Sequence, residues 1–319
     1  MWAYIVRRFL QALLILFIIT MLCFVLTRLS SDPMSQYSER TGMTAADKEA
    51  IRARLGLDQP MPVQYVKWLG LALQGDLGAS FFSHQPVLKL IGQRLPLTLI
   101  LMSTAEVVII IVSLFLGLIA AVKQYSLTDN LITSFSFVGY SMPIFFIAFG
   151  CIQIFAVQFK AWGLPYLPTG ADIWDPKDPI ALARHLILPV FSLVAIQTAG
   201  YSRYLRSSIL EVLGMDYVRT AQAKGLVWRT VLFRHALRNA ILPFVTIVGL
   251  DIPFLLGGAL VTESVFAWPG MGRLFWEYAQ RGDYPVVLGV LLITSSAVVF
   301  FTIIVDLIYT IVDPRIRLS

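Results

Sequence analysis

Residues 97–122 read LTLILMSTAEVVIIIVSLFLGLIAAV and contain one charged side chain, Glu106. A helix of roughly 20 apolar residues is long enough to cross the hydrocarbon core of a bilayer, because each residue adds about 1.5 Å. A helix that is hydrophobic on every face needs either a large protein core or lipid around it. This stretch therefore predicts a transmembrane helix.

Five further apolar runs of similar length predict an all-α membrane protein with six spans. They cover residues 9–29, 133–158, 186–204, 240–262 and 285–309. Small residues within the runs, such as Gly117 and Gly139, indicate where two helices can approach closely. The first run follows two arginines but continues to Leu29 without a small-residue cleavage site, so it is interpreted as a retained span and not as a signal peptide.

The composition agrees with this class of protein. Hydrophobic residues make up 57% of the 319 residues and charged residues 14%, and the mean hydropathy is +0.75. Soluble chains are about 45–50% apolar and about 25% charged. The net charge of +6 comes from basic residues scattered between apolar runs, which argues against a nucleic-acid-binding protein. Cys23 and Cys151 both lie in apolar runs, so no structural disulfide is expected.

The distribution of basic residues predicts that both termini lie inside the cell. With this orientation the inner segments carry twelve lysines and arginines, and the two short outer loops carry five. Short inner loops are enriched in such residues, whereas a long loop such as 30–96 is not bound by this rule. The inner twelve are Arg7, Arg8, Lys123, Arg203, Arg206, Arg219, Lys224, Arg229, Arg234, Arg238, Arg315 and Arg317; the outer five are Lys160, Lys177, Arg184, Arg273 and Arg281.

The outer loop of residues 30–96 predicts a small helical cap. A capping box at residues 44–47 opens a helix that ends near Gly56. Two prolines separate it from an amphipathic stretch, Val63–Gln74, which Gly75 closes. The expected organisation is thus an N-terminal tail with the first span (1–29), the cap (30–96), and a core domain with five spans (97–319).

The inner loop of residues 205–239 predicts three helices. Four apolar residues at helical spacing form the first, which Gly214 ends. Asp216 is the expected N-cap of a short helix, Tyr217–Lys224, which Gly225 stops. The third helix runs from Trp228 to Ile241 and enters the membrane at Pro243.

The short helix of this loop raises the question of what holds it. About eight residues do not form a stable helix alone in water, where ~12–15 are marginal, so either this chain or a partner must hold it. The loop carries seven basic residues and two acidic ones. Two interpretations stay open: a docking surface for a partner protein, or a topology signal and nothing more.

Several segments in order carry a family resemblance. They are LGLDQP (55–60), GDLG (75–78), SMP (141–143), DYVRTAQAKG (216–225), HALRNAILP (235–243), ESVFAWPGMG (263–272), DYPV (283–286) and DPRIR (313–317). The chain resembles binding-protein-dependent ABC importer permeases, in particular the first permease of dipeptide and oligopeptide systems. The general signature begins with Glu-Ala-Ala, and TAQA (220–223) replaces that acidic start here, as in peptide-type members.

This resemblance implies one permease subunit of an ATP-driven importer in the inner or plasma membrane of a bacterium or archaeon. The expected partners are a homologous second permease, two ATP-binding cassette ATPase subunits, an extracytoplasmic solute-binding protein and membrane lipid, with no nucleic acid. The spans 2–6 would line a path for di- or oligopeptides. Nickel, glutathione and oligosaccharide remain alternative substrates within the same class of importer.

The resemblance also implies roles for particular residues. The coupling residues, expected to contact the ATPase, are Tyr217, Val218, Arg219, Thr220, Ala221, Gln222, Ala223, Lys224, Gly225, His235, Asn239 and Pro243, with Ala221 on the docking face. Intramembrane acids usually face an interior or an aqueous cavity. Glu106 and Asp251 are therefore expected along the translocation path, together with Ser141. The outer gate or loop comprises Glu263, Trp268, Pro269 and Gly270.

Other classes of protein find less support in the sequence. It contains no GxxxxGK[ST] loop, no HExxH and no GxSxG, and its three histidines are scattered. No cofactor, metal site or enzymatic activity is therefore expected, and ATP hydrolysis is assigned to the partner subunits. A secondary transporter would usually carry inverted repeats and interrupted helices, and no repeat is visible.

Overall fold

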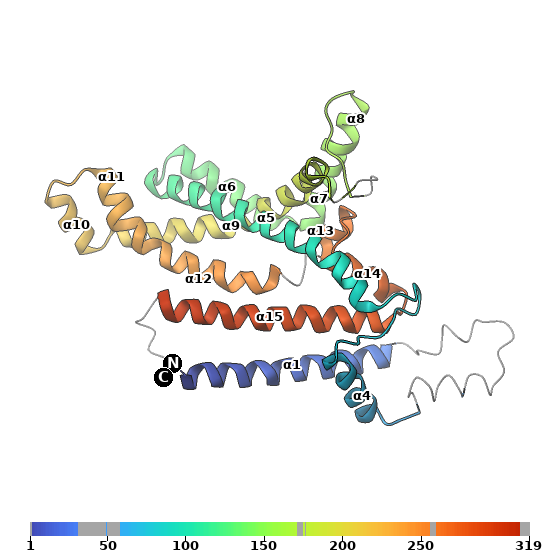
Figure 1. The fold of residues 1–319 in the computed structure, drawn as a ribbon. Coiled ribbons are helices and arrows are strands. Elements are labelled where there is room, and N and C mark those ends of the chain that lie inside the picture. Colours follow the sequence, from blue (N-terminus) through green and yellow to red (C-terminus); the bar gives the residue numbers. More distant parts are fainter. Residues whose placement is uncertain are drawn as a thin grey trace. The chain divides into compact units, whose positions relative to one another are not determined.

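The computed structural model describes residues 2–30, 49, 58–170, 175, 177–255 and 260–312. Within these ranges the ordered elements are helices, and β-structure is confined to an isolated bridge between Ala79 and Pro86. The all-α prediction is confirmed. The helices (Figure 1) are α1 Trp2–Ser30, α4 Met61–Leu73, α5 Val87–Val122, α6 Leu127–Ser141, α7 Ile144–Cys151, η1 Ile152–Gln158, α8 Phe159–Ala161, α9 Pro179–Leu213, α10 Asp216–Ala223, α11 Trp228–Thr230, η2 Val231–Leu237, α12 Arg238–Leu255, α13 Leu260–Val265, α14 Met271–Gln280 and α15 Tyr284–Val312.

Six helical stretches in the described part of the chain are long and apolar enough to cross a membrane, as predicted. They are Val6–Leu29, Val87–Val122, Ile144–Ala161, Pro179–Leu213, Trp228–Asp251 and Tyr284–Val305. Helices α5 and α9 extend beyond the apolar runs that predicted them. The reason is that polar residues at their ends continue the helix without adding to the run.

The third predicted span, 133–158, is wrong as a single helix. Helix α6 ends at Ser141 and α7 begins at Ile144. Between them, Met142 and Pro143 have extended backbones with ψ of 131° and 139°. Proline lacks a backbone N–H and disfavours the helical conformation of the residue before it, so this apolar run is divided into two helices.

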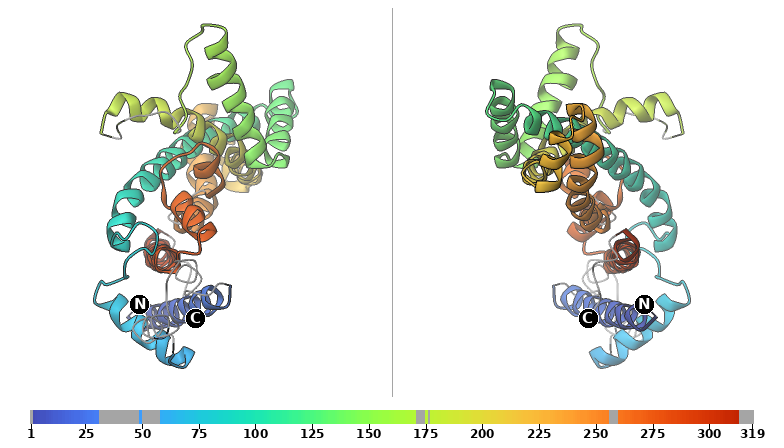
Figure 2. Two further views of the ribbon diagram at one scale, coloured as in Figure 1. Left: turned by 90° about the vertical axis from the view of Figure 1, so that its right-hand side faces the viewer. Right: turned by 90° about the vertical axis from the view of Figure 1, so that its left-hand side faces the viewer.

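The chain forms two compact units. The first comprises Met1–Leu97 and Gly270–Ser319. In this unit α1 packs along α15 (Figure 2). Helix α4 packs on α1, and α14 packs on α15. Its core joins Val87 and Ile91 of α5 to Met271 and Leu274 of α14 and Val286 of α15.

The second unit comprises Thr98–Pro269, and its central helix is α9. Helices α6, α7, α10, α12 and α13 pack against it. Two close approaches confirm the prediction from small residues. A Cβ atom on Gly139 would lie 2.5 Å from the carbonyl oxygen of Ala195, and one on Gly117 would lie 2.9 Å from that of Ser202. Glycine at both positions therefore lets the helices pack backbone to backbone.

The outer loop is only partly described. The predicted helix from the capping box to Gly56 lies outside the described residues. The second predicted helix is confirmed as α4, which is followed by Gly75 with a φ of +84°. The division of the chain into a cap and a core domain stays a prediction. The compact units are divided differently, because the first unit combines Met1–Leu97 with Gly270–Ser319.

Candidate functional site

Helix α10 is held by side chains of the same chain. Val218 is fully buried and Ala221 is 6% exposed. Both belong to an apolar cluster that includes Val231 of η2, and Val212 and Leu213 of α9 pack against it. The cluster provides the tertiary contacts that an eight-residue helix needs. In this fold it is therefore the chain itself that holds the short helix.

Two predictions about α10 are wrong, and one is confirmed. Ala221 does not lie on an outward face, because residues three apart share one side of a helix and Ala221 packs inward with Val218. Asp216 is not the N-cap; Met215 occupies that position, and Asp216 is the first helical residue, where its charge favours the helix dipole. Gly225 has a φ of +76°, the left-handed conformation expected of a helix stop.

The outward side of α10 and the residues that flank the helix carry an exposed mixture of basic and apolar side chains, which we call the α10 surface. Arg219, Gln222 and Lys224 are exposed. Sequence reasoning missed the apolar part of this surface, although four large side chains in a loop between spans were a usable signal. Exposed large apolar side chains that gather on one surface are typical of a protein–protein contact. The apolar members are Met215, Leu226, Val227 and Trp228, which are between 41% and 70% exposed.

Polar contacts fix α10 relative to the following helix. The Asn239 side-chain amide donates to the Tyr217 hydroxyl at 2.8 Å and to the His235 carbonyl at 3.4 Å. Ser208 of α9 donates to the Ala240 carbonyl at 2.8 Å. Three of the predicted coupling residues thus lie together. Pro243, one turn further along α12, is exposed.

Glu106 and Asp251 come together around a tyrosine that the sequence reasoning missed. The Tyr201 hydroxyl donates to Asp251 Oδ2 at 2.6 Å and lies 3.4 Å from Glu106 Oε1. The Gln197 side chain also donates to Asp251 Oδ2, at 3.3 Å. We call these four residues the carboxylate cluster; they join α5, α9 and α12 across the second unit.

The carboxylate cluster has spare capacity to accept hydrogen bonds. Glu106 is 5% exposed, and its Oε2 has no hydrogen-bond partner among the described residues. No lysine or arginine in those residues forms an ion pair with either carboxylate. Such an arrangement can hold a cationic group. Ser141 does not belong to it: this residue is exposed at the end of α6 and has no hydrogen bond to the cluster in the described part of the chain.

The predicted outer gate residues are largely buried. Glu263 and Trp268 are fully buried. The Glu263 carboxylate accepts from the Thr98 hydroxyl at 2.7 Å, and its backbone carbonyl accepts from the Trp268 N–H at 2.8 Å. Pro269 is half-buried, and Gly270 is the N-cap of α14. These contacts define a tightly folded turn, and its assignment to a gate stays a prediction.

An ion pair between a buried aspartate and a partly buried arginine links α6 to α9. The Arg206 guanidinium donates to both carboxylate oxygens of Asp129, at 2.8 and 2.7 Å. This hydrogen-bonded guanidinium holds the pKa of the Asp129 carboxyl below its usual range. A lowered pKa in the folded state contributes stability at pH values above the usual range, and that contribution is lost as the pH falls through the lowered value. From sequence, Arg206 was recognisable only as one more inner basic residue.

Six helices that can span a membrane define the class of this chain: it is a multi-pass membrane protein. The short helix α10 lies between two of these spans. The chain belongs to the family of binding-protein-dependent transport system inner membrane components. The family match covers residues 113–318, and the corresponding N-terminal component matches residues 1–102.

Relatives are similar over nearly the whole chain. The oligopeptide transport system permease protein AppB of Bacillus subtilis is 42% identical, with 99% of this chain and 100% of the relative covered. The glutathione transport system permease protein GsiC of Escherichia coli is 37% identical, with 98% of each covered. The dipeptide transport system permease protein DppB of Escherichia coli K12 is 36% identical, with 94% of each covered.

A solved structure supports the fold alone. It is described as the crystal structure of an amino acid ABC transporter with histidines. The similarity has a TM-score of 0.52 at 15% sequence identity and covers 69% of this chain and 92% of the other.

Proposed function

We propose that this chain is one permease subunit of an ATP-driven importer and forms half of a path for di- or oligopeptides. The observation that carries the substrate class is the near full-length similarity to permeases named for oligopeptide and dipeptide transport. The carboxylate cluster supports it, because a peptide with a free amino terminus presents a cationic group that two acids can stabilise. Ser141 is kept as a further path residue.

The partners follow from the family and from the α10 surface. A homologous second permease completes the path, a solute-binding protein delivers the peptide from outside, and two ATPase subunits hydrolyse ATP. The α10 surface, which includes the exposed Arg219 and Val227, docks on an ATPase subunit. The predicted residues Val218 and Ala221 serve this docking indirectly, since they hold α10 in place.

The orientation belongs to the same proposal: both termini and α10 are cytoplasmic, supported by the charge distribution. Single cysteines at the exposed positions Gln124 and Lys224 should react with an impermeant maleimide only in inverted vesicles. One at the exposed Gln85 should react in spheroplasts. Labelling of the Lys224 position in intact spheroplasts would contradict the topology.

Uptake by the complete transporter in proteoliposomes tests the substrate. ATP-dependent accumulation of a radiolabelled tripeptide, with no accumulation of nickel or an oligosaccharide, is the expected result. Glutathione is the second candidate, because a glutathione permease is 37% identical. Accumulation of glutathione that excess tripeptide does not compete would replace the general peptide assignment.

A further inference from the structure

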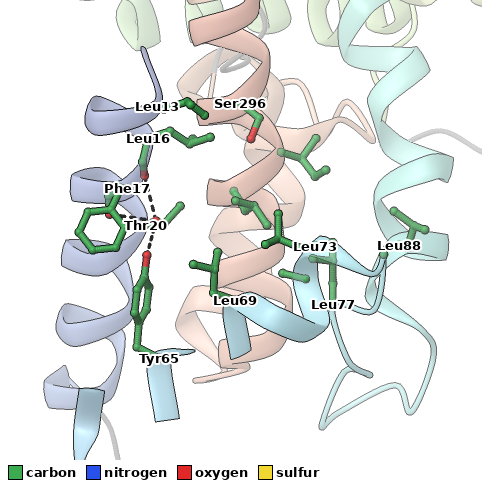
Figure 3. A pocket seen from close by; sticks show the side chains of 14 residues that line it. Leu13, Leu16, Phe17, Thr20, Tyr65, Leu69, Leu73, Leu77, Leu88 and Ser296 are labelled. Carbon is green, nitrogen blue, oxygen red and sulfur yellow. Dashed lines mark hydrogen bonds between the residues drawn. The ribbon is translucent and has the colours of Figure 1, made fainter. Parts of the chain in front are cut away.

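An apolar cavity of about 440 Å³ lies within the first compact unit, between α1, α4 and α15. Leu13, Leu16 and Phe17 of α1 line one wall, and Leu69 and Leu73 of α4 lie across from them (Figure 3). Residues of α15, including Ser296, complete the lining. The volume lies in the range of small-molecule sites, about 300–1,000 Å³.

A hydrogen bond and aromatic contacts join α4 to α1 beside this cavity. The hydroxyl groups of Thr20 and Tyr65 share a hydrogen bond of 2.9 Å, visible at the α1 side of Figure 3. The Tyr65 ring also meets Phe17 and Phe24 edge to face, with centroids 5.8 and 5.6 Å apart. Trp68 packs on the same group. Helix α4 is therefore fixed on α1, and the cavity is preformed.

Two of the three walls lie at the depth of the hydrocarbon. Residues 13–20 are central in the candidate span Val6–Leu29, roughly 10 Å or more from either end at 1.5 Å per residue. Residues 292–296 lie about 12–18 Å from the start of α15. Apolar cavities exclude water. In a bilayer, the apolar groups that surround this cavity and can enter it are lipid acyl chains.

Exposed apolar side chains of α4 also fit a lipid environment. Val66 is 67% exposed and Leu71 50%, and Leu73, which lines the cavity, is 81% exposed. An amphipathic helix with aromatic residues on it is typical of the membrane interface, where such apolar side chains are not left in water. This position places the acyl chains of one leaflet next to the mouth of the cavity.

A basic residue, Arg28, lies at the C-terminal end of the candidate span that lines the cavity. Thr20, Phe24 and Arg28 follow one another at four-residue spacing and so share one face of α1. Arg28 stacks over the Phe24 ring at 5.3 Å, and its Nε has no hydrogen-bond partner among the described residues. It lies about 12 Å along α1 from Thr20.

We propose that this cavity binds one acyl chain of a membrane phospholipid whose phosphate is held by Arg28. The lipid stabilises the packing of α1 and α4 on α15. This inference depends on the six-span fold and not on the transported substrate.

Photolabelling of the complete transporter tests the site. The probe is a phosphatidylethanolamine with a diazirine at the end of one acyl chain, in vesicles of phosphatidylethanolamine and phosphatidylglycerol. We expect the label to concentrate on peptides that contain residues 13–20, 69–73 and 292–296. Leu16→Trp fills the cavity and should lower this labelling several-fold. Leu22→Trp, on the same helix at a side chain 51% exposed, is the matched control and should not.

Two further variants keep the test decisive. Ser296→Phe fills the cavity from the opposite wall, so it should also lower labelling even if Leu16→Trp disturbs α1. Arg28→Gln should reduce labelling several-fold, and unchanged labelling would overturn the phosphate contact. Label spread evenly over the exposed face of α1, or unaffected by both filling variants, would overturn the acyl-chain site. Label on the partner permease in place of the cavity residues would identify a protein occupant and overturn it too.

Discussion

Replacing Val218 with alanine tests whether the apolar cluster holds α10 in its docked position. The side chain is fully buried and loses two methyl groups. At about 0.8 kcal/mol for each buried carbon, the loss is ~1.6 kcal/mol before any cavity term is added. Since 1.4 kcal/mol corresponds to tenfold in an equilibrium constant, the undocked population of α10 should rise about tenfold.

Hydrogen exchange of the complete chain in detergent or nanodiscs measures this change directly. Amides near the end of α10 should exchange about tenfold faster in Val218→Ala, while those in the middle of α9 should not change. Gln222→Ala, an exposed position on the same helix, is the control. Under the proposed function, peptide-stimulated ATP hydrolysis should fall in Val218→Ala with normal membrane insertion. Equal exchange in the two variants would refute the role of the cluster.

Three further predictions concern other contacts. Gly225→Val should abolish peptide-stimulated ATP hydrolysis without loss of inserted protein, because a β-branched residue disfavours a φ of +76°; Gly225→Asn, which tolerates this conformation, should retain it. Asp129→Asn should lower the midpoint of thermal unfolding, with a loss of about 1–2 kcal/mol, since it weakens two hydrogen bonds from the partly buried Arg206 and removes its charged partner; an unchanged midpoint would contradict this. Asp251→Asn keeps an acceptor for Tyr201 but removes the charge, so uptake of a peptide with a free amino terminus should slow more than that of its N-acetylated form, and equal slowing would remove Asp251 from the path.

The sequence predicted the elements whose signal is local. Long apolar runs located the spans, and glycine at position 225 marked the end of a short helix. The break of the third span was missed because the apolar run continues through Met142 and Pro143 without a change in composition. Its local signal was the proline itself, which disfavours a helical residue before it.

The contacts between helices were harder to predict, because periodicity gives the buried face of a helix but not what covers it. Ala221 was placed outward on the assumption that a partner held α10, whereas α9 and η2 cover that face. The link between Glu106 and Asp251 depends on Tyr201, which is 95 and 50 residues away from them in the sequence. No pattern in a single sequence indicates such a pairing.

The internal packing of α10 has a mechanical consequence. Ordering the backbone of eight residues costs on the order of 8–16 kcal/mol at 1–2 kcal/mol each, and contacts within the chain offset this cost before any partner arrives. A protein that binds the α10 surface therefore binds a helix that is already folded. Its binding free energy is not reduced by the cost of ordering that helix. Val218 and Ala221 pack with residues of α9 and η2, and both of these helices belong to candidate spans. A displacement of α10 would therefore shift the ends of two spans.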